Sequence, residues 1–191
     1  MPDVLIETIT DPTQAAAVAE VAAATFPLAC PPHSTPADIA GFIRANLRPE
    51  SFAGHIENPN TDVLVARHSP GGPVVGYTLV HHEAPQHPDV AEVVTQRPVS
   101  ELSKMYVVPD HHARGSGGAP SHALMHAAIE CSRRRGSVLI WLGVNQENER
   151  AQRFYAKMGF ARAGVKTFDL NGSVEHDFIF TRRLTSGRVD S

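Results

Sequence analysis

The sequence predicts an α/β protein, because segments with the two-residue period of strands alternate with segments that carry helix start signals. Residues 4–9 alternate apolar and polar side chains, which is typical of a half-buried strand. Asp11 and Pro12 then supply a cap and a first helical position for an alanine-rich helix that is expected to end near residue 25. A Ser-Pro-Gly-Gly turn at residues 69–72 predicts a hairpin. These three observations place helices and a sheet in one chain.

The other elements are predicted by the same local signals. A second helix is expected to begin at Thr35, which can cap it, and to run through Leu47 with Pro36 at its first position. The proline-rich segment 83–98 shows little periodicity and is predicted to be a loop. The remaining predictions are a short helical turn at 52–56, strands at 62–68, 74–82, 100–108 and 138–144, helices at 121–135 and 149–158, and a final hairpin turning at Asn171-Gly172.

Length, cysteine usage and charge limit the class of protein. A chain of 191 residues can bury a substantial core, and we expect one domain over residues 1–184 followed by a flexible tail at 185–191. Two cysteines without a C-x-x-C spacing fit a reducing compartment rather than a disulfide framework. A net charge of −3 without a basic arm argues against nucleic-acid binding. No apolar run reaches the roughly 20 residues of a membrane span, so the expected location is cytoplasmic.

The eleven histidines do not form a metal-binding motif. His81-His82 and His111-His112 are adjacent pairs, and adjacent side chains in a strand point to opposite faces of the sheet. The sequence also lacks an H-E-x-x-H helix. We therefore expect no metal.

A glycine-rich turn separates the predicted strand at 100–108 from the predicted helix at 121–135. Glycines allow consecutive backbone N–H groups to converge, and the positive end of the following helix favours an anion. The turn lacks the Lys-Ser or Lys-Thr of a nucleoside triphosphate loop and the G-x-G-x-x-G spacing of a dinucleotide site. It is either a phosphate cradle or an ordinary loop. Its residues are Arg114, Gly115, Ser116, Gly117, Gly118 and Ala119.

A second motif, N-x-x-A-x-x-F-Y-x-x-x-G-F, runs from Asn148 to Phe160 after the predicted strand at 138–144. Taken alone, its helical spacing predicts a helix that packs an aromatic face on a sheet and ends at Gly159.

Together, the glycine turn and the aromatic helix one strand later resemble the GNAT superfamily of acetyl-CoA-dependent N-acetyltransferases. Residues 24–33, 143–160 and 174–178 look like a bacterial subgroup whose substrates are mostly unassigned. The resemblance implies a mixed, mostly antiparallel sheet of about seven strands with a central parallel splayed pair, flanked by about four helices. It also implies acetyl-CoA as the cosubstrate.

The family's R-x-x-G-x-G/A signature is matched by Arg114, Gly117 and Ala119. The resemblance implies that N–H groups from Gly115 to about Ser121 hold the pyrophosphate of coenzyme A. One departure concerns the following helix, whose aliphatic pair lies two positions farther from Arg114 than in most members. Either the loop is longer by two residues or the helix starts later, at Pro120.

The resemblance also assigns the remaining cofactor contacts. Pantetheine is expected to pair with the backbone of Met105, Tyr106, Val107 and Val108, and the N–H of Val107 is expected to hold the developing oxyanion. Asn148 matches the family asparagine that contacts the cofactor, whereas Asn145 is either a further contact or the helix cap.

Two residues are candidates for proton transfer. Tyr155 is expected to donate a proton to the coenzyme A thiolate as it leaves, the alternative being a buried tyrosine that bonds a backbone carbonyl. Glu101 matches the position of a glutamate base in some members, and the alternative is a strand-end carboxylate in an ion pair. Water or His176 could instead accept the proton of the amine.

Our main hypothesis is direct transfer of acetyl from acetyl-CoA to a primary amine of a small molecule or peptide through a ternary complex. The alternatives are a noncatalytic acyl-CoA-binding or regulatory module and a nucleotide-binding protein that uses the same cradle. The acceptor is open at this stage. The final strand, if exposed, could pair across a homodimer.

Overall fold

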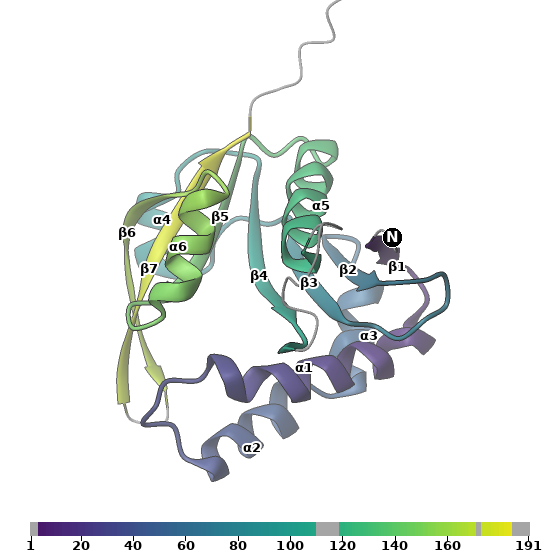
Figure 1. Cartoon of the computed structure of the whole chain (residues 1–191). Helices are drawn as coiled ribbons and strands as arrows, with labels where there is room; N and C mark the ends of the chain where they lie inside the picture. The colour runs from purple at the N-terminus through teal and green to yellow at the C-terminus, as the bar shows by residue number, and fades with distance from the viewer. Residues whose placement is uncertain (1–3, 110–118, 171–172, 185–191) are drawn as a thin grey trace, which may run out of the picture. The chain divides into compact units, whose positions relative to one another are not determined.

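Helices and strands alternate along the chain in the computed structural model, which describes residues 4–109, 119–170 and 173–184 (Figure 1). In chain order the elements are β1 (Leu5–Ile9), a 3-10 helix η1 (Pro12–Gln14), α1 (Ala15–Ala29), α2 (Pro36–Asn46), α3 (Pro49–Glu57), β2 (Thr61–Arg67), β3 (Gly76–His81), α4 (Pro88–Val93), β4 (Val99–Val107), α5 (Pro120–Arg134), β5 (Leu139–Asn145), α6 (Glu149–Lys157), β6 (Ala161–Leu170) and β7 (Ser173–Arg183). The strands form one seven-stranded sheet in the order β1-β2-β3-β4-β5-β7-β6. Strands β4 and β5 pair in parallel, whereas β1–β2, β5–β7 and β6–β7 are antiparallel. The predicted α/β class and parallel central pair are confirmed.

The chain folds as two compact units, and the boundaries between them fall within or next to β3, β4 and α5. The first unit comprises residues up to Val80 together with the segment Lys104–Ala128. The second comprises His81–Ser103 and the residues from Ile129 onward. The tail at 185–191 lies outside the described residues.

The predicted helix caps form. The Asp11 side chain accepts a hydrogen bond from the Thr13 N–H (2.9 Å), and Thr35 Oγ1 accepts one from the Asp38 N–H (3.1 Å). The expected end of the first helix near residue 25 is wrong, because α1 continues through Pro27 to Ala29. Packing between helices accounts for the extension, since Phe26 stacks on the Phe42 ring of α2 at 4.5 Å.

The predicted loop at 83–98 contains a helix, α4, and this expectation is also wrong. His87 caps the helix by accepting a hydrogen bond from the Asp89 N–H at 3.2 Å, and Pro88 takes the first helical position. Val90 and Val94 are fully buried. Histidine is an unusual cap and the helix is too short to show a period, so no strong local signal marks it. With α3 and α4 included, the described part of the chain has six α-helices instead of about four.

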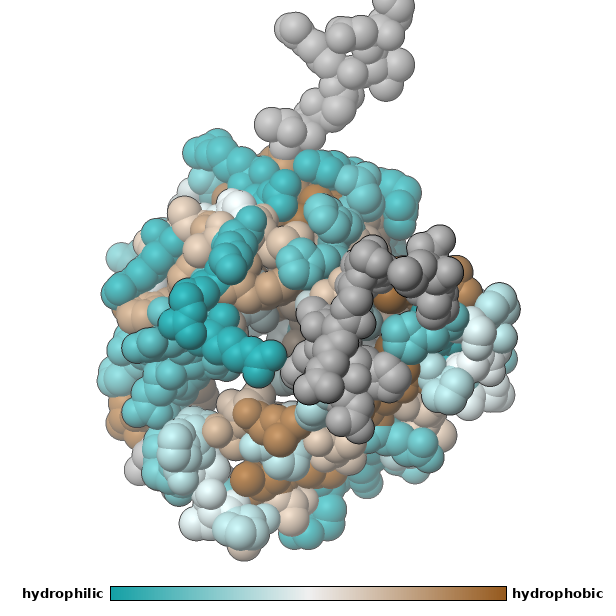
Figure 2. Space-filling view, viewed as in Figure 1, coloured by the Kyte–Doolittle hydropathy of each residue, from teal (hydrophilic) through white to brown (hydrophobic). Residues whose placement is uncertain are grey.

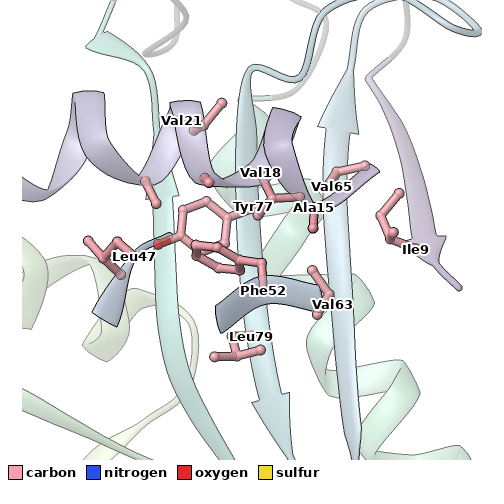
Figure 3. Packing of buried hydrophobic residues seen from close by; sticks show 12 residues of the cluster. Ile9, Ala15, Val18, Val21, Leu47, Phe52, Val63, Val65, Tyr77 and Leu79 are labelled. Carbon is pink, nitrogen blue, oxygen red and sulfur yellow. The ribbon is translucent and has the colours of Figure 1, made fainter. Parts of the chain in front are cut away.

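The core of the first unit lies between the sheet and helices α1 and α3 (Figure 3). The Phe52 ring of α3 meets the Tyr77 ring of β3 edge to face, with centroids 5.5 Å apart. Both residues are buried. The Tyr77 hydroxyl has no hydrogen-bond partner among the described residues, and burial raises the pKa of Tyr77 far above its ordinary value. The hydroxyl therefore contributes a desolvation cost rather than a bond.

We expect Tyr77→Phe to leave the free energy of unfolding unchanged or to raise it by up to about 1 kcal/mol, because the substitution removes an unpaired buried hydroxyl. Urea unfolding followed by circular dichroism would measure the change. Leu79→Ala, in the same cluster, is the sensitivity control and should cost about 2–5 kcal/mol. A loss above about 1 kcal/mol in Tyr77→Phe would show that the hydroxyl has a partner.

The core of the second unit lies between α4 and one face of its sheet. It is formed by Val90, Val94, Val99, Leu139, Trp141 and Ile179. No helix in residues 4–109, 119–170 and 173–184 has the length and apolar character needed to cross a membrane.

Candidate active site

The pairing of β4 with β5 ends before either strand ends. Val99, Ser100 and Glu101 pair with Leu139, Ile140 and Trp141, whereas β4 continues to Val107 and β5 to Asn145. Backbone groups on the facing edges beyond Glu101 and Trp141 are therefore not used in this ladder. This is the parallel pair at which the family resemblance places the cofactor.

The second half of β4 is held from one side by β3, within the first unit. The Val108 N–H donates to the Val75 carbonyl at 2.9 Å, and Thr78 Oγ1 donates to the Lys104 carbonyl at 2.8 Å. Because N–H directions alternate along a strand, the N–H of Val107 lies on the β4 edge opposite β3. Val107 is buried, whereas Met105, Tyr106 and Val108 are partly buried.

Gly76 allows β3 to approach β4 closely. A Cβ at this position would lie 2.9 Å from the Tyr106 carbonyl oxygen and 3.0 Å from Val107 Cγ2. Only glycine fits without moving the backbone that carries the candidate oxyanion donor. The Tyr106 ring also packs against Tyr77, with centroids 5.9 Å apart.

Helix α5 begins at Pro120, the later of the two starts that the sequence left open. The Ala119 carbonyl accepts hydrogen bonds from the N–H groups of His122 (3.0 Å) and Ala123 (3.2 Å). Leu124 and Met125, the displaced aliphatic pair, are fully buried. The rest of the glycine-rich turn lies outside the described residues, and it includes Arg114, Gly115, Ser116, Gly117 and Gly118.

The start of α6 is organised by two asparagines, in the second unit. Asn148 caps the helix by accepting a hydrogen bond from the Ala151 N–H at 3.1 Å. Asn145 accepts one from the Glu147 N–H at 2.9 Å and so shapes the preceding turn. The helix cap is therefore Asn148, and the alternative role of Asn145 as cap is wrong. Gln152 ties the turn to the helix by donating to the carbonyls of Asn145 (3.2 Å) and Gln146 (2.9 Å).

Tyr155 lies on α6 and is partly buried. Its ring contacts Phe154 and Phe160, with centroid separations of 5.5 and 6.1 Å. The helix ends where the sequence predicts, because Gly159 takes a positive φ of 84°. The aromatic contacts orient the phenol ring independently of its hydroxyl.

Glu101 and α6 lie on opposite faces of the sheet of the second unit. Glu101 is in register with Trp141, which packs in the core beneath α4. Helix α6 lies over the other face, where Arg182 of β7 donates to the Met158 carbonyl at 2.6 Å. Figure 1 shows α4 and α6 on the two sides of the β5, β7 and β6 strands. The two candidate proton-transfer groups thus belong to different faces.

His176 lies on the face of β7 that α6 covers, because it alternates with Asp177. The sheet position of His176 is exposed, and its Nδ1 lies 3.1 Å from Thr167 Oγ1. This hydrogen bond joins the imidazole of β7 to the neighbouring strand β6.

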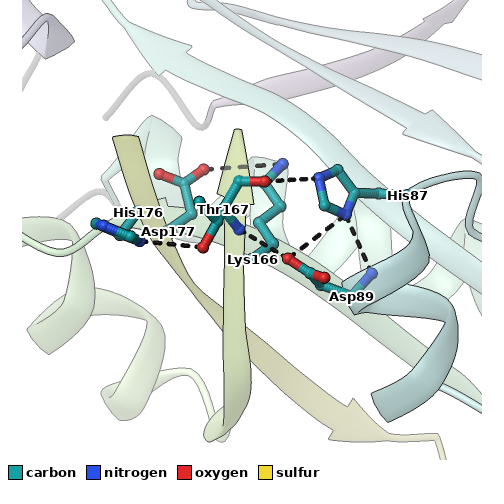
Figure 4. A network of polar contacts seen from close by, with 6 residues as sticks. All are labelled: His87, Asp89, Lys166, Thr167, His176 and Asp177. Carbon is teal, nitrogen blue, oxygen red and sulfur yellow. Dashed lines mark hydrogen bonds and ion pairs between the residues drawn. The ribbon is translucent and has the colours of Figure 1, made fainter. Parts of the chain in front are cut away.

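A polar group that the sequence analysis missed lies on the opposite face of the same hairpin (Figure 4). Lys166 Nζ lies 3.8 Å from Asp177 Oδ2, and the two side chains are only 22% and 15% exposed. Burial raises the pKa of Asp177, Lys166 opposes this effect and Glu175 adds to it. The register that pairs Leu170 with Ser173 also places Lys166 opposite Asp177. The predicted turn residues Asn171-Gly172 lie outside the described residues.

The polarity of the surface over α1 and α2 differs from that over α6. Figure 2 shows hydrophobic residues gathered over α1 and α2, and Leu28 of α1 is 65% exposed. The same view shows a hydrophilic band over α6, where Glu149, Arg150, Arg153 and Lys157 are exposed.

Comparisons with known proteins agree with this geometry. The model of the Acetyltransferase (GNAT) family matches residues 24–160. An uncharacterized N-acetyltransferase of Mycobacterium tuberculosis (strain ATCC 25618 / H37Rv) is 42% identical over 172 residues, which cover 90% of this chain and 99% of the relative. The crystal structure of PaiA N-acetyltransferase from Thermoplasma acidophilum in complex with coenzyme A has a TM-score of 0.69 at 20% identity, covering 95% of this chain and 99% of that one. A putative acetyltransferase from Salmonella typhimurium with its cofactor acetyl-CoA has a TM-score of 0.59 at 19% identity, covering 96% and 95%.

The fold and these matches define a transferase of acyl groups. The family model spans well over half of the chain, and the mycobacterial relative spans nearly all of it. The chain belongs to the GNAT acetyltransferase family and is an N-acetyltransferase.

Proposed function

We propose that this chain transfers the acetyl group of acetyl-CoA directly to a primary amine of a small molecule or peptide, in a ternary complex. The observation that carries the proposal is the early end of the β4–β5 pairing. The pairing ends at Glu101, a carboxylate on the face opposite α6, whereas β4 continues to Val107. Structures of similar fold, described with coenzyme A or acetyl-CoA, support the choice of cosubstrate.

The described residues fit an acyl-CoA substrate. Backbone of β4 can pair with an extended pantetheine in the manner of a neighbouring strand. Helix α5 begins at Pro120, and the positive end of its dipole favours an anion such as a pyrophosphate. The glycine-rich turn from Arg114 to Gly118 is proposed to complete this cradle.

The proposed chemistry assigns one proton to each of two side chains. Glu101, or a water in its place, removes one proton from the acceptor ammonium and releases it to solvent. The neutral amine attacks the thioester carbon, and the Val107 N–H stabilises the negative charge that develops on the carbonyl oxygen. As the carbon–sulfur bond breaks, Tyr155 donates its proton to sulfur. After the attack the nitrogen loses a second proton, and Tyr155 takes up one proton to return to its neutral form. The products are an amide and coenzyme A.

A thiol-release screen tests the proposal. Purified protein is mixed with acetyl-CoA and a panel of primary amines that includes alkylamines, diamines, amino acids, amino-acid amides and short peptides, and free coenzyme A is measured with a thiol reagent. We expect amine-dependent release, and no displacement of bound coenzyme A by ATP in a parallel titration. Tight binding of acetyl-CoA without release by any amine would instead favour a noncatalytic module. Competition by ATP would favour a nucleotide-binding protein.

A further inference from the structure

The Lys166 and Asp177 side chains meet over Gly143 of β5, a residue without a side chain. A Cβ at Gly143 of β5 would lie 3.2 Å from Asp177 Oδ2, 3.2 Å from Lys166 Cε and 3.3 Å from Lys166 Nζ. Gly143 is exposed, although its neighbours Leu142 and Val144 are buried. The backbone of β5 is thus open to solvent at the point where a carboxylate and an ammonium meet.

This point lies next to the end of the β4–β5 pairing. Trp141 is the last residue of β5 in register with β4, and Gly143 follows it on the same face of the strand. Glu101 is on that face as well, because it pairs with Trp141. Asp177 and Glu101 therefore lie on one face. The Asp177 carboxylate reaches the position of Gly143, which is one strand spacing and two residues along the strand from Glu101, or about 8 Å.

The hairpin that carries the pair is braced on its outer edge, as Figure 4 shows. Asp89 Oδ2 accepts a hydrogen bond from the Thr167 N–H at 2.9 Å, and His87 Nε2 lies 3.0 Å from the Thr167 carbonyl oxygen. Both backbone groups of the residue after Lys166 are thereby fixed to the start of α4. Such bracing limits the movement of Lys166 relative to β6.

The charges at this place favour an added cation. Asp177 and Glu175 are two carboxylates on one face of β7, and Lys166 is the basic side chain that forms an ion pair with Asp177. The Lys166–Asp177 separation of 3.8 Å is longer than a charge-assisted hydrogen bond, which is about 2.7–2.9 Å. The carboxylate can therefore accept a closer ammonium than the one that faces it.

We propose that Asp177 is the carboxylate that binds the acceptor's ammonium, and that Lys166 holds it in place over Gly143 until the acceptor displaces the lysine. This inference rests on the proposed acetyl transfer to a primary amine. It assigns acceptor recognition to β7, and a water carries the proton from the bound ammonium to Glu101 on the same face of the sheet.

Two substitutions separate a ligand site from a structural ion pair. Asp177→Asn keeps the shape but removes the charge, and we expect it to raise the amine KM and to lower kcat/KM by about 10- to 100-fold, as for one lost charge-assisted hydrogen bond. Lys166→Met removes the competing cation and should lower the amine KM. A purely structural pair would respond to either substitution in the same direction. Asp169→Asn is the control, because Asp169 is an exposed carboxylate on the same hairpin but alternates to the other face.

Thermal stability gives an independent readout. The pKa of Asp177 is raised in the folded protein, so its ionised form costs stability above its ordinary pKa, and the cost fades as the pH falls. Asp177→Asn should therefore leave Tm unchanged or raise it at neutral pH.

The measurements are thiol-release kinetics with the amine that the screen identifies, acetyl-CoA titration and Tm. Opposite changes in amine KM for Asp177→Asn and Lys166→Met, with acetyl-CoA affinity retained, would support the proposal. Equal losses in both variants, or an Asp177→Asn protein within about threefold of wild type, would overturn it while leaving the transferase function intact. If no amine of the panel causes the wild-type protein to release thiol, the proposed function and this inference are both overturned.

Discussion

Replacing Tyr155 by phenylalanine is expected to lower kcat for acetyl transfer by about 10²- to 10⁴-fold, the usual contribution of a positioned general acid. The phenol proton would no longer reach the sulfur as the thiolate leaves. The ring would stay in place, because its contacts with Phe154 and Phe160 do not involve the hydroxyl. Affinity for acetyl-CoA and Tm should therefore change little. Thiol-release kinetics at saturating acetyl-CoA, a binding titration and a thermal melt would measure the three quantities.

Tyr77→Phe is the matched control for this substitution, since it removes the same atom from a tyrosine in the core of the first unit. It should retain full activity. A Tyr155→Phe protein that turns over an identified amine at the wild-type rate would show that the general-acid role is wrong. Loss of acetyl-CoA binding in this variant would indicate that the hydroxyl serves affinity instead of proton transfer.

Replacing Glu101 by glutamine is expected to lower kcat/KM for the amine by about 10²-fold near pH 7. The substitution preserves the size of a partly buried side chain beside Trp141 but removes the proton acceptor. The deficit should shrink as the pH rises toward the pKa of the amine, because each pH unit increases the neutral amine about tenfold and this form needs no base. A pH profile of kcat/KM for both proteins would measure the effect.

Glu92→Gln serves as the control for Glu101, because Glu92 is an exposed glutamate on α4 in the same unit. Its profile should overlay that of the wild type. A Glu101→Gln protein with an unchanged profile would instead assign proton removal to water. A deficit that stays constant with pH would assign Glu101 to structure, since a structural defect does not depend on the ionisation of the amine.

Elements with strong local signals were predictable from the sequence. The Asp11 cap, the Thr35 cap and the Gly159 helix end each use a residue whose backbone preference or side-chain chemistry acts over one turn. The extension of α1 through Pro27 and the formation of α4 were not predictable in this way. Both depend on packing, through the Phe26–Phe42 stack and the burial of Val90, and such contacts outweigh local propensity.

The candidate site also contains some residues that local sequence signals predicted and others whose position depends on tertiary structure. The motif from Asn148 to Phe160 marked α6 and Tyr155, because capping and aromatic spacing are local, and the glycine turn marked the approach to α5. Which residues share a face was not marked locally. Glu101 meets Trp141 through a parallel pairing of strands that are distant in sequence.

Local sequence therefore sufficed for the family, the helix boundaries at caps and glycines, and the residue types available for proton transfer. The fold alone placed Asp177 and Lys166 over Gly143, and ended the β4–β5 pairing at Glu101. Capping and turn chemistry act between neighbours along the chain, so they can be inferred from the sequence. Strand register and burial bring together residues from β5, β6 and β7, and the resulting proximity and desolvation exist only after folding.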